Sequence, residues 1–508
     1  MTDMKKIIGV IAIMLTITGC SNFDDINTNP NTPTEVSASL LCTNIILSVT
    51  KYQGADAKAY ISDNALPKYV AYANEGQLGT QYNFISNASF GSMTILPDVE
   101  KMLQAAQGTP AENSYKGIAH FVRAYTFYLL TMKMGDIPYS ESGQGALGNF
   151  KPKYDTQKQV FQGILTELEE ASAAFAAGAT FAGDPTPFAG DNTKWQRAVN
   201  AFQLKVLMSL SNKANDAELR IPQRFAAIVN DNKLLENANQ YLGLEYNSVS
   251  RHPLYSTNDM FTGRTILSTT VVDNLKLLND KRLYYFGEPA EAKRIAGIPA
   301  TSPDAYVGVD TAIDYAGLNA TYATGTYSRI NLKYQTDQAS EPRRMLTYAE
   351  QQLILAEARI RGWISSGTAQ QYYESGVKAA LTMVMNSNAA YAHGNALTQA
   401  DIDGYFTGQA AFATSQENQL MQIGLQRYLL NFLMDADTAY FEYRRTGYPA
   451  LSINPATSLN VNNPAAVPVR YLYPASELTF NAEHLTEALN RQFGGYDEIN
   501  KRMWTLSQ

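Results

Sequence analysis

The sequence contains few of the residues from which catalytic, metal and nucleic-acid sites are usually built. Its 508 residues include two cysteines and four histidines, and only 17% of them are charged. The histidines stand singly, and no nucleophile elbow, phosphate-binding loop or paired-cysteine zinc pattern is present. A formal net charge of -7 argues against nucleic acid, because phosphate binding calls for basic patches. We therefore expect no metal, no cofactor and no nucleic-acid partner.

Carboxylates do not form a hydrolase pattern either. Glu169 and Glu170 are neighbours in a predicted helix, so their side chains point about 100° apart and cannot flank one bond. A glycosidase needs two carboxyl groups roughly 5–10 Å apart across a cleft. A surface glycan hydrolase stays open as an alternative, and nothing in the sequence favours it.

The first 19 residues have the pattern of a targeting segment. Lys5 and Lys6 form a cationic start, and an apolar run follows over residues 7–17. The run is shorter than the roughly 20 residues that span a bilayer, so it is typical of a signal peptide. Ile-Thr-Gly-Cys resembles a lipobox, which predicts that Cys20 is diacylated on sulfur and becomes the mature N-terminus. An ordinary signal with a coincidental cysteine is the alternative.

No second apolar run of spanning length follows, so we expect the mature chain to be tethered by its acyl chains. Residues 20–35 are predicted to be the lipid-proximal tether. The only other cysteine is Cys42, which leaves the mature chain without an intramolecular disulfide. The remainder, residues 36–508, is predicted to form one helical domain.

Apolar periodicity predicts helices through most of this domain. The clearest lies over residues 112–134, where Ile118, Phe121, Val122 and Tyr125 fall at i, i+3, i+4 and i+7. Other helices are predicted over residues 37–52, 156–175, 195–210, 347–363, 368–385 and 416–435. Close pairs joined by short turns indicate antiparallel helical hairpins stacked side by side, although no strict 34-residue repeat is visible.

Residues 250–342 differ from the helical parts, because they are rich in Gly, Pro, Thr, Asn and Tyr. Seven of the 32 tyrosines lie within residues 284–334, where an even distribution would place about three. Long irregular segments in compact proteins are usually functional or disordered, and this tyrosine density argues against disorder. Tyrosine suits wet recognition surfaces, and packing between helices is the alternative role.

The sequence resembles the SusD/RagB family, and more closely its SusD-like lipoprotein branch, almost from end to end. Beyond the lipobox, the resemblance rests on residues 23–31 (FDDINTNPN), 190–195 (GDNTKW), 346–350 (LTYAE), 355–358 (LAEA), 440–449 (YFEYRRTGYP) and 468–474 (PVRYLYP). The stretch over residues 440–449 is the most specific. Its own pattern is that of a helix end, with Gly447 as a left-handed cap and Pro449 as a stop. We therefore expect this stretch to be mostly structural, with ligand contact as the alternative.

This resemblance implies a mainly α fold, in which tetratricopeptide-like helix pairs form a right-handed superhelical scaffold with a loop-rich insert at residues 250–342. It also implies a non-catalytic, surface-exposed lipoprotein of the outer membrane. Such a protein captures a nutrient and delivers it to a SusC-like TonB-dependent transporter. Asp24 and Asp25, just behind Cys20, are similar to the surface-export signals of these lipoproteins.

By analogy with the family, two loops are expected to form the ligand site. The first matches residues 79–84 (GTQYNF), with Tyr82 as an aromatic platform and Asn83 as a partner for hydroxyl groups. Candidate platforms in the insert are Tyr285, Tyr306, Tyr322 and Tyr327. Sugar rings lay their C–H faces on aromatic rings while planar polar side chains bind the hydroxyls, so we expect an oligosaccharide. A peptide or other oligomer, or a purely structural lid without ligand contact, are the alternatives.

Overall fold

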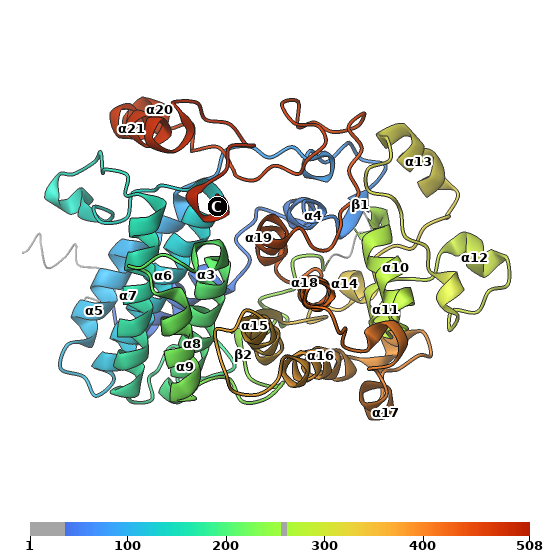
Figure 1. Ribbon diagram of the computed structural model, residues 1–508, viewed down its shortest axis with the longest axis horizontal. Coiled ribbons are helices and arrows are strands. Elements are labelled where there is room, and N and C mark those ends of the chain that lie inside the picture. Colours follow the sequence, from blue (N-terminus) through green and yellow to red (C-terminus); the bar gives the residue numbers. More distant parts are fainter. Residues whose placement is uncertain (1–35, 256–261, 508) are drawn as a thin grey trace, which may run out of the picture.

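A computed structural model of the protein describes residues 36–255 and 262–507. Helices dominate this part of the chain, and the named strands form two small antiparallel pairs (Figure 1). No described helix is long and apolar enough to cross a membrane. The predicted signal peptide, Cys20 and the predicted tether lie outside the described residues.

The N-terminal half forms one group of packed helices. These are α3 (Ala38–Thr50), α5 (Leu96–Ala106), α6 (Glu112–Met134), α7 (Gln157–Ala176), α8 (Asn192–Ser209) and α9 (Ile221–Asp231). Consecutive helices pack on one another, α6 on α7, α7 on α8 and α8 on α9. A capping box begins α7, in which the side chains of Thr156 and Gln159 each accept from the other residue's backbone N–H. The expected helical hairpins are confirmed here.

A second group of helices continues the array in the C-terminal half. Its main members are α15 (Tyr348–Ile360), α16 (Ala369–Met385), α18 (Gln416–Leu430) and α19 (Ala436–Thr446). Helix α15 packs against α8, α16 and α18, so it joins the two groups. The helix predicted over residues 416–435 is shorter than expected, because the chain turns at Leu433 (φ 48°) before Asp435 caps α19.

Short elements make up the remaining structure. The helices are α4 (Ala57–Ala65), α10 (Thr269–Leu277), α11 (Arg282–Phe286), α12 (Glu291–Ile295), α13 (Tyr315–Ala323), α14 (Lys333–Thr336), α17 (Gln399–Asp403), α20 (Glu477–Phe480) and α21 (Ala482–Phe493). The strands are β1 (Val70–Tyr72), β2 (Tyr241–Leu244), β3 (Thr265–Leu267) and β4 (Arg343–Thr347). Strand β1 pairs with β3, and β2 pairs with β4. Helices α10 to α14 and strand β3 belong to the predicted insert, which is therefore folded rather than uniformly irregular.

The stretch over residues 440–449 ends a helix, as its pattern predicts. Helix α19 stops at Thr446, and Gly447 (φ 78°) donates its N–H to the carbonyl oxygen of Tyr443 at 2.7 Å. Arg445 turns inward instead of into solvent. Its guanidinium contacts both carboxylate oxygens of Glu357 on α15, at 2.6 and 2.7 Å. The structural role expected for this stretch is confirmed.

Arg445 is part of a buried ion network between α8, α15, α18 and α19. Its members are Lys205, Glu350, Glu357, Arg427, Glu442 and Arg445. Arg427 contacts Glu350 at 3.1 Å, and Lys205 contacts the other oxygen of the same carboxylate at 3.2 Å. Every buried carboxylate of the network therefore has a cationic partner, without which burial would be costly.

Candidate functional site

The structure brings the two predicted loops together. Residues 79–84 follow β1 and contain the short helix η1 (Thr80–Tyr82). The hydroxyl of Tyr82 donates to the carbonyl oxygen of Ile313 in the insert at 3.0 Å. Gln81 donates to the carbonyl oxygen of Thr311, also in the insert, at 3.2 Å. The two predicted loops are therefore in direct contact.

A third segment completes this surface, and nothing in the sequence indicated it. The backbone N–H of Leu459 donates to the carbonyl oxygen of Tyr82 at 2.7 Å. The hydroxyl of Thr457 donates to the carbonyl oxygen of Ala312 at 2.9 Å. We call the surface formed by these three segments the tyrosine face. It comprises residues 74–84, 310–327 and 452–461.

Three tyrosines of α13 and its flank are partly buried on this face: Tyr315, Tyr322 and Tyr327. They pack on a small cluster made of Ala71, Ala73, Ile266, Val309 and Leu318. The hydroxyl of Tyr322 donates to the carbonyl oxygen of Gly263 at 3.0 Å, and that of Tyr315 accepts the N–H of Gly76 at 2.7 Å. These two hydrogen bonds hold the rings in place while part of each ring stays accessible.

The other predicted residues are buried. Tyr82 and Asn83 are 2% and 3% exposed, and Tyr285 and Tyr306 are 1% and 0% exposed. Tyr306 packs edge-on against Tyr284 at 5.3 Å between ring centroids. Burial also raises the pKa of Tyr82 to about 12. In this conformation the protein covers these side chains, so they order the loops, and Tyr322 and Tyr327 are the predicted platforms with accessible surface.

Phe84 is the ring of the first loop that faces solvent, and sequence reasoning did not single it out. It is 48% exposed, beside the buried Tyr82. Asn83 adopts a left-handed conformation (φ 64°), which turns the chain between the two rings. A Cβ atom at Gly79 would lie 3.1 Å from the Phe84 ring, so the small residue leaves room for it. The position of Asn83 between two aromatic residues was the available sequence signal for this turn, because Asn adopts the left-handed conformation more readily than most residues.

Two charges near the face have partners within the protein, whereas Asp310 and Asp314 of the face are exposed, and no ion pair is formed by either among the described residues. Glu75 contacts Arg264 at 3.2 Å and also accepts a hydrogen bond from the Tyr72 hydroxyl. Lys68 lies beneath the face, 1% exposed, and donates to the carbonyl oxygen of Gln81. Burial lowers the pKa of Lys68 to about 7, with Asp310 opposing that shift. The face therefore offers rings, amides and hydroxyls together with the carboxylates of Asp310 and Asp314, which suit a polar ligand without negative charge.

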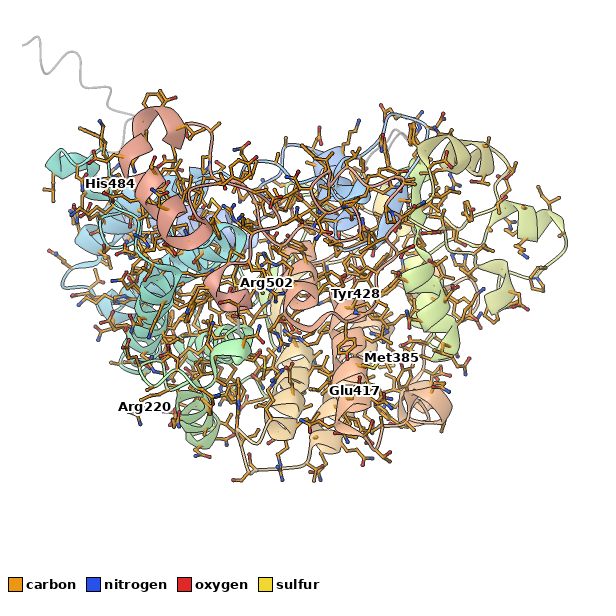
Figure 2. All side chains as sticks on the ribbon, turned by 45° about the horizontal axis from the view of Figure 1, so that its top comes forward. Arg220, Met385, Glu417, Tyr428, His484 and Arg502 are labelled. Atoms are coloured by element: carbon orange, nitrogen blue, oxygen red, sulfur yellow. The ribbon has the colours of Figure 1, made fainter. Side chains whose placement is uncertain are left out.

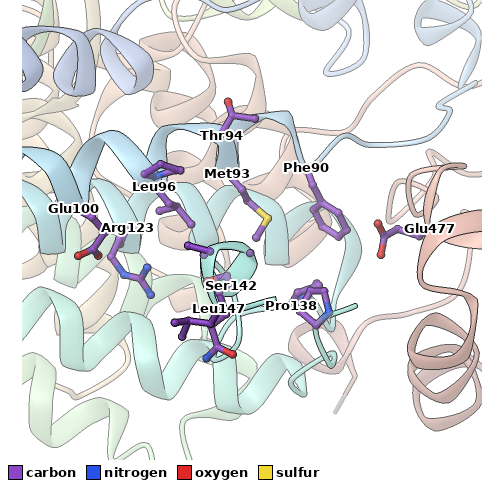
Figure 3. Close-up of a pocket in the computed structure, with 16 residues that line it drawn as sticks. Phe90, Met93, Thr94, Leu96, Glu100, Arg123, Pro138, Ser142, Leu147 and Glu477 are labelled. Atoms are coloured by element: carbon purple, nitrogen blue, oxygen red, sulfur yellow. The ribbon is translucent and has the colours of Figure 1, made fainter. Parts of the chain in front are cut away.

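A separate apolar cleft of about 670 Å³ lies beside α5 and α6 (Figure 3). Phe90, Met93 and Leu96 line one side, and the loop containing Pro138 and Leu147 lines another. Its lining includes none of the six predicted ligand residues. The cleft fits an apolar group, and the charged residues Glu100, Arg123 and Glu477 also line it.

One histidine has more partners than its isolated position in the sequence suggested. His120 on α6 lies beside Glu167 and Glu170 of α7, and their possible ligand atoms are within 4.8 Å of one another. Arg123 donates to Glu167 at 2.9 Å, while His120 contacts the other oxygen of that carboxylate at 2.6 Å. Pairing between α6 and α7 explains this cluster without an ion.

The chain is similar to one protein family and to several proteins of known structure. A family profile called SusD-like, described as starch-binding and associating with the outer membrane, matches residues 30–474. A SusD homologue of known structure from Bacteroides fragilis is 40% identical, with a TM-score of 0.88 over 93% of this chain and 100% of that one. A candidate outer-membrane protein from Bacteroides vulgatus, described in terms of nutrient binding, is 30% identical, with a TM-score of 0.83 and the same coverage.

More distant structures share the fold. A chitin-binding SusD homologue from Flavobacterium johnsoniae is 19% identical, with a TM-score of 0.71 over 93% of this chain and 99% of that one. At this identity the likeness shows the fold alone. None of the curated proteins matches the sequence. The mainly helical, tetratricopeptide-like fold expected from the sequence is thereby confirmed.

Proposed function

This chain belongs to the SusD-like family, and from that premise we propose that it captures an oligosaccharide at the tyrosine face and delivers it to a SusC-like TonB-dependent transporter. The proposal includes a lipid anchor at Cys20 and a position on the outer surface of the outer membrane. It includes no catalytic step, in keeping with the starch-binding description of the family profile.

The observation that carries the proposal is the convergence of three distant segments around Tyr82, together with the partly exposed rings of Tyr322 and Tyr327 in one of those segments. Their rings are partly buried on one side, and the Tyr322 hydroxyl is fixed by a hydrogen bond of 3.0 Å. A ring that is already ordered loses little side-chain entropy when a sugar stacks on it. The pairing of Glu75 with Arg264 removes one charge from the vicinity of the face, which adds to the fit for an uncharged sugar.

Peptide binding by the same delivery mechanism is the alternative within the binding class. Tyrosine rings and amides serve peptides as well as sugars, so the ligand class needs a direct measurement. A surface glycan hydrolase and a lid without ligand contact are the alternatives outside that class. The first requires turnover of a polymer, and the second requires that neither glycans nor peptides bind.

Calorimetry with purified wild-type protein and a panel of maltohexaose, chitohexaose, xylohexaose and tryptic peptides tests the proposal. We expect one glycan to bind, and Tyr322→Ala to weaken that binding at least tenfold. Tyr496→Ala is the matched control, because Tyr496 is 63% exposed and lies outside the tyrosine face. Peptide binding alone, or equal glycan affinity in all three proteins, would contradict the proposal.

The anchor and the transporter are tested in cells. Cys20→Ser should abolish palmitate labelling and shift the protein from the outer-membrane fraction to the soluble periplasmic fraction. Wild-type protein should co-purify with a large β-barrel transporter from membranes dissolved in mild detergent. Continued labelling of the variant would refute the lipobox, and purification without a barrel protein would refute the delivery step.

A further inference from the structure

Two adjoining hollows share Arg359, the penultimate residue of α15. The first has a volume of about 320 Å³ and is lined by Asn230 of α9 and by Trp363, among others. The second has a volume of about 360 Å³ and is lined by Gln416 and Gln419 of α18, among others. We call the two hollows together the Arg359 groove. Each is within the size range of small-molecule sites.

The Arg359 groove lies away from the tyrosine face. Helices α9, α15 and α16 occupy the lower part of Figure 1, whereas β1 and α13 occupy its upper part. Figure 2 agrees: Arg220, at the start of α9, and Glu417, next to Gln416, lie toward the lower edge. A ligand in the Arg359 groove would therefore not contact Tyr322 or Tyr327.

Trp363 has the setting of an aromatic platform. Helix α15 ends at Ile360, and Gly362 (φ 74°) reverses the chain so that the N–H of Trp363 donates to the carbonyl oxygen of Ala358 at 2.9 Å. The ring packs edge-on against Phe225 at 5.5 Å between centroids, yet it stays partly exposed and lines the first hollow. Phe225 therefore supports the buried side of the Trp363 ring.

Arg359 differs from the other arginines around α15. Arg361 is paired with Glu357 at 2.8 Å, and Arg445 is paired with the same carboxylate. Across residues 36–255 and 262–507, Arg359 has no ion pair, and its Nε donates to the carbonyl oxygen of Gly367 at 3.1 Å. That contact orients the guanidinium and leaves its two terminal nitrogens for a ligand. An arginine fork matches a carboxylate in geometry and charge.

We propose that the Arg359 groove is a second ligand site, which binds an oligosaccharide carrying a carboxylate. A sugar ring stacks on Trp363, and Arg359 binds the carboxylate of that ring or of its neighbour. The side-chain amides of Asn230, Gln416 and Gln419 line the groove where hydroxyl groups would lie. This site goes beyond the proposed function, because it differs from the tyrosine face in both position and ligand charge.

Calorimetry with two uronate probes tests this assignment. The probes are tetragalacturonate and tetramannuronate, each compared with its fully methyl-esterified form. We expect at least one free acid to bind, and its ester to bind at least tenfold more weakly because the ester lacks the charge. Trp363→Ala and Arg359→Gln should each weaken binding of the acid at least tenfold, and Arg359→Lys should weaken it less.

Two control variants separate this site from the rest of the protein. Arg224→Gln removes a partly exposed arginine of α9 that pairs with Glu169, and it should bind the acid like wild type. Tyr322→Ala should also bind the acid like wild type, because Tyr322 lies on the tyrosine face. Circular dichroism confirms that each variant is folded before titration.

Three results for the acids, the ester and Trp363→Ala would overturn the assignment. They are the absence of binding by both acids, equal affinity of Trp363→Ala and wild type, and equal affinity for acid and ester. Loss of acid binding in Tyr322→Ala alone would also overturn it, while leaving the proposed function of the tyrosine face intact. Conversely, failure of neutral glycans to bind at the tyrosine face would leave the uronate result unaffected.

Discussion

The buried ion network and the tyrosine face differ in how they expose their polar side chains. In the network, full charges are enclosed, with Arg445 and Glu357 each 3% exposed in their side chains. On the tyrosine face, neutral rings are partly exposed, and the hydroxyl of Tyr322 bonds one backbone carbonyl. The first arrangement is costly to disturb, because a charge left without its partner stays buried. The second can be altered with little cost and is available to a ligand.

The pKa of Glu357 expresses the same contrast. Burial alone would raise it, yet the guanidinium of Arg445 and its hydrogen bonds lower the pKa of Glu357 to about 2. A carboxylate with a lowered pKa stabilises the fold above its unfolded pKa and loses that contribution as the pH falls toward 2. Burial on the tyrosine face instead raises the pKa of Tyr82 to about 12, so its hydroxyl remains a neutral donor at ordinary pH.

Arg445→Met should produce the largest loss of stability. Both Glu357 and Glu442 lose a buried partner, and breaking a buried ion pair costs roughly 3–5 kcal/mol. We expect a loss near the upper end of this range, measured by urea unfolding at pH 7. The difference should shrink below about pH 4, because protonation of Glu357 then removes the negative charge that lost Arg445 as a partner.

Arg224→Met provides the matched control for that variant. Its partner Glu169 has a side chain 53% exposed, and an exposed pair contributes about 0–1 kcal/mol. If both substitutions lowered the free energy of unfolding equally, the buried ion pairs would contribute no more to stability than an exposed pair.

Trp195→Ala should cost a similar amount for a different reason. Trp195 is 0% exposed, stacks on Phe175 at 5.7 Å and donates its ring N–H to Asp184 at 2.7 Å. Truncating a buried aromatic residue costs roughly 3–5 kcal/mol through lost burial and the cavity left behind. Thermal and urea unfolding should both show the loss. Trp195→Phe should lose less, and equal losses in the two variants would mean that packing of the ring is not the main contribution.

The helices of the scaffold were largely predictable because their signals are local. Apolar residues recurring with the helical period of about 3.6 residues predicted a helix over residues 112–134, and α6 has these bounds. The helix predicted over residues 416–435 ends at Leu430 in the structure. The turn at Leu433 that follows it has no signature in the apolar pattern. Asp435, which accepts from the N–H of Thr438 at 3.0 Å, was the signal that a new helix begins there.

The site was less predictable because it depends on contacts distant in the sequence. Sequence reasoning proposed the two loops that meet at Tyr82, and it missed residues 452–461. Which ring faces outward was also hidden, since Asn83 turns Tyr82 inward and leaves Phe84 exposed. The composition gives the number of tyrosines, but packing between distant segments decides which of them are buried. Tyr306 is a core residue, whereas Tyr322 is partly accessible.

Lys68→Met should have a pH-dependent effect on stability where the scaffold meets the tyrosine face. The pKa of Lys68 falls from 10.5 to about 7 on folding, so the unfolded chain binds more protons between these values. The wild-type free energy of unfolding should therefore gain up to about 1.4 kcal/mol per pH unit between pH 7 and 10 from this residue. Unfolding measured across that range should show a flatter slope in the variant, and identical slopes would mean that the Lys68 pKa is not lowered.

Tyr327→Ala should have the smallest effect on stability and a large effect on binding. Tyr327 is partly exposed beside the small cluster under α13, and surface substitutions usually change stability by less than about 0.5 kcal/mol. A stacking ring contributes roughly 1–3 kcal/mol to binding, so affinity for the glycan found in the panel should fall about tenfold or more. Tyr306→Ala is the matched comparison, because that ring is 0% exposed and its loss should lower the melting temperature strongly. Calorimetry and thermal unfolding on both variants decide the matter. If the affinity of Tyr327→Ala falls only together with its melting temperature, Tyr327 belongs with the scaffold; if neither changes, the ligand binds elsewhere on the face.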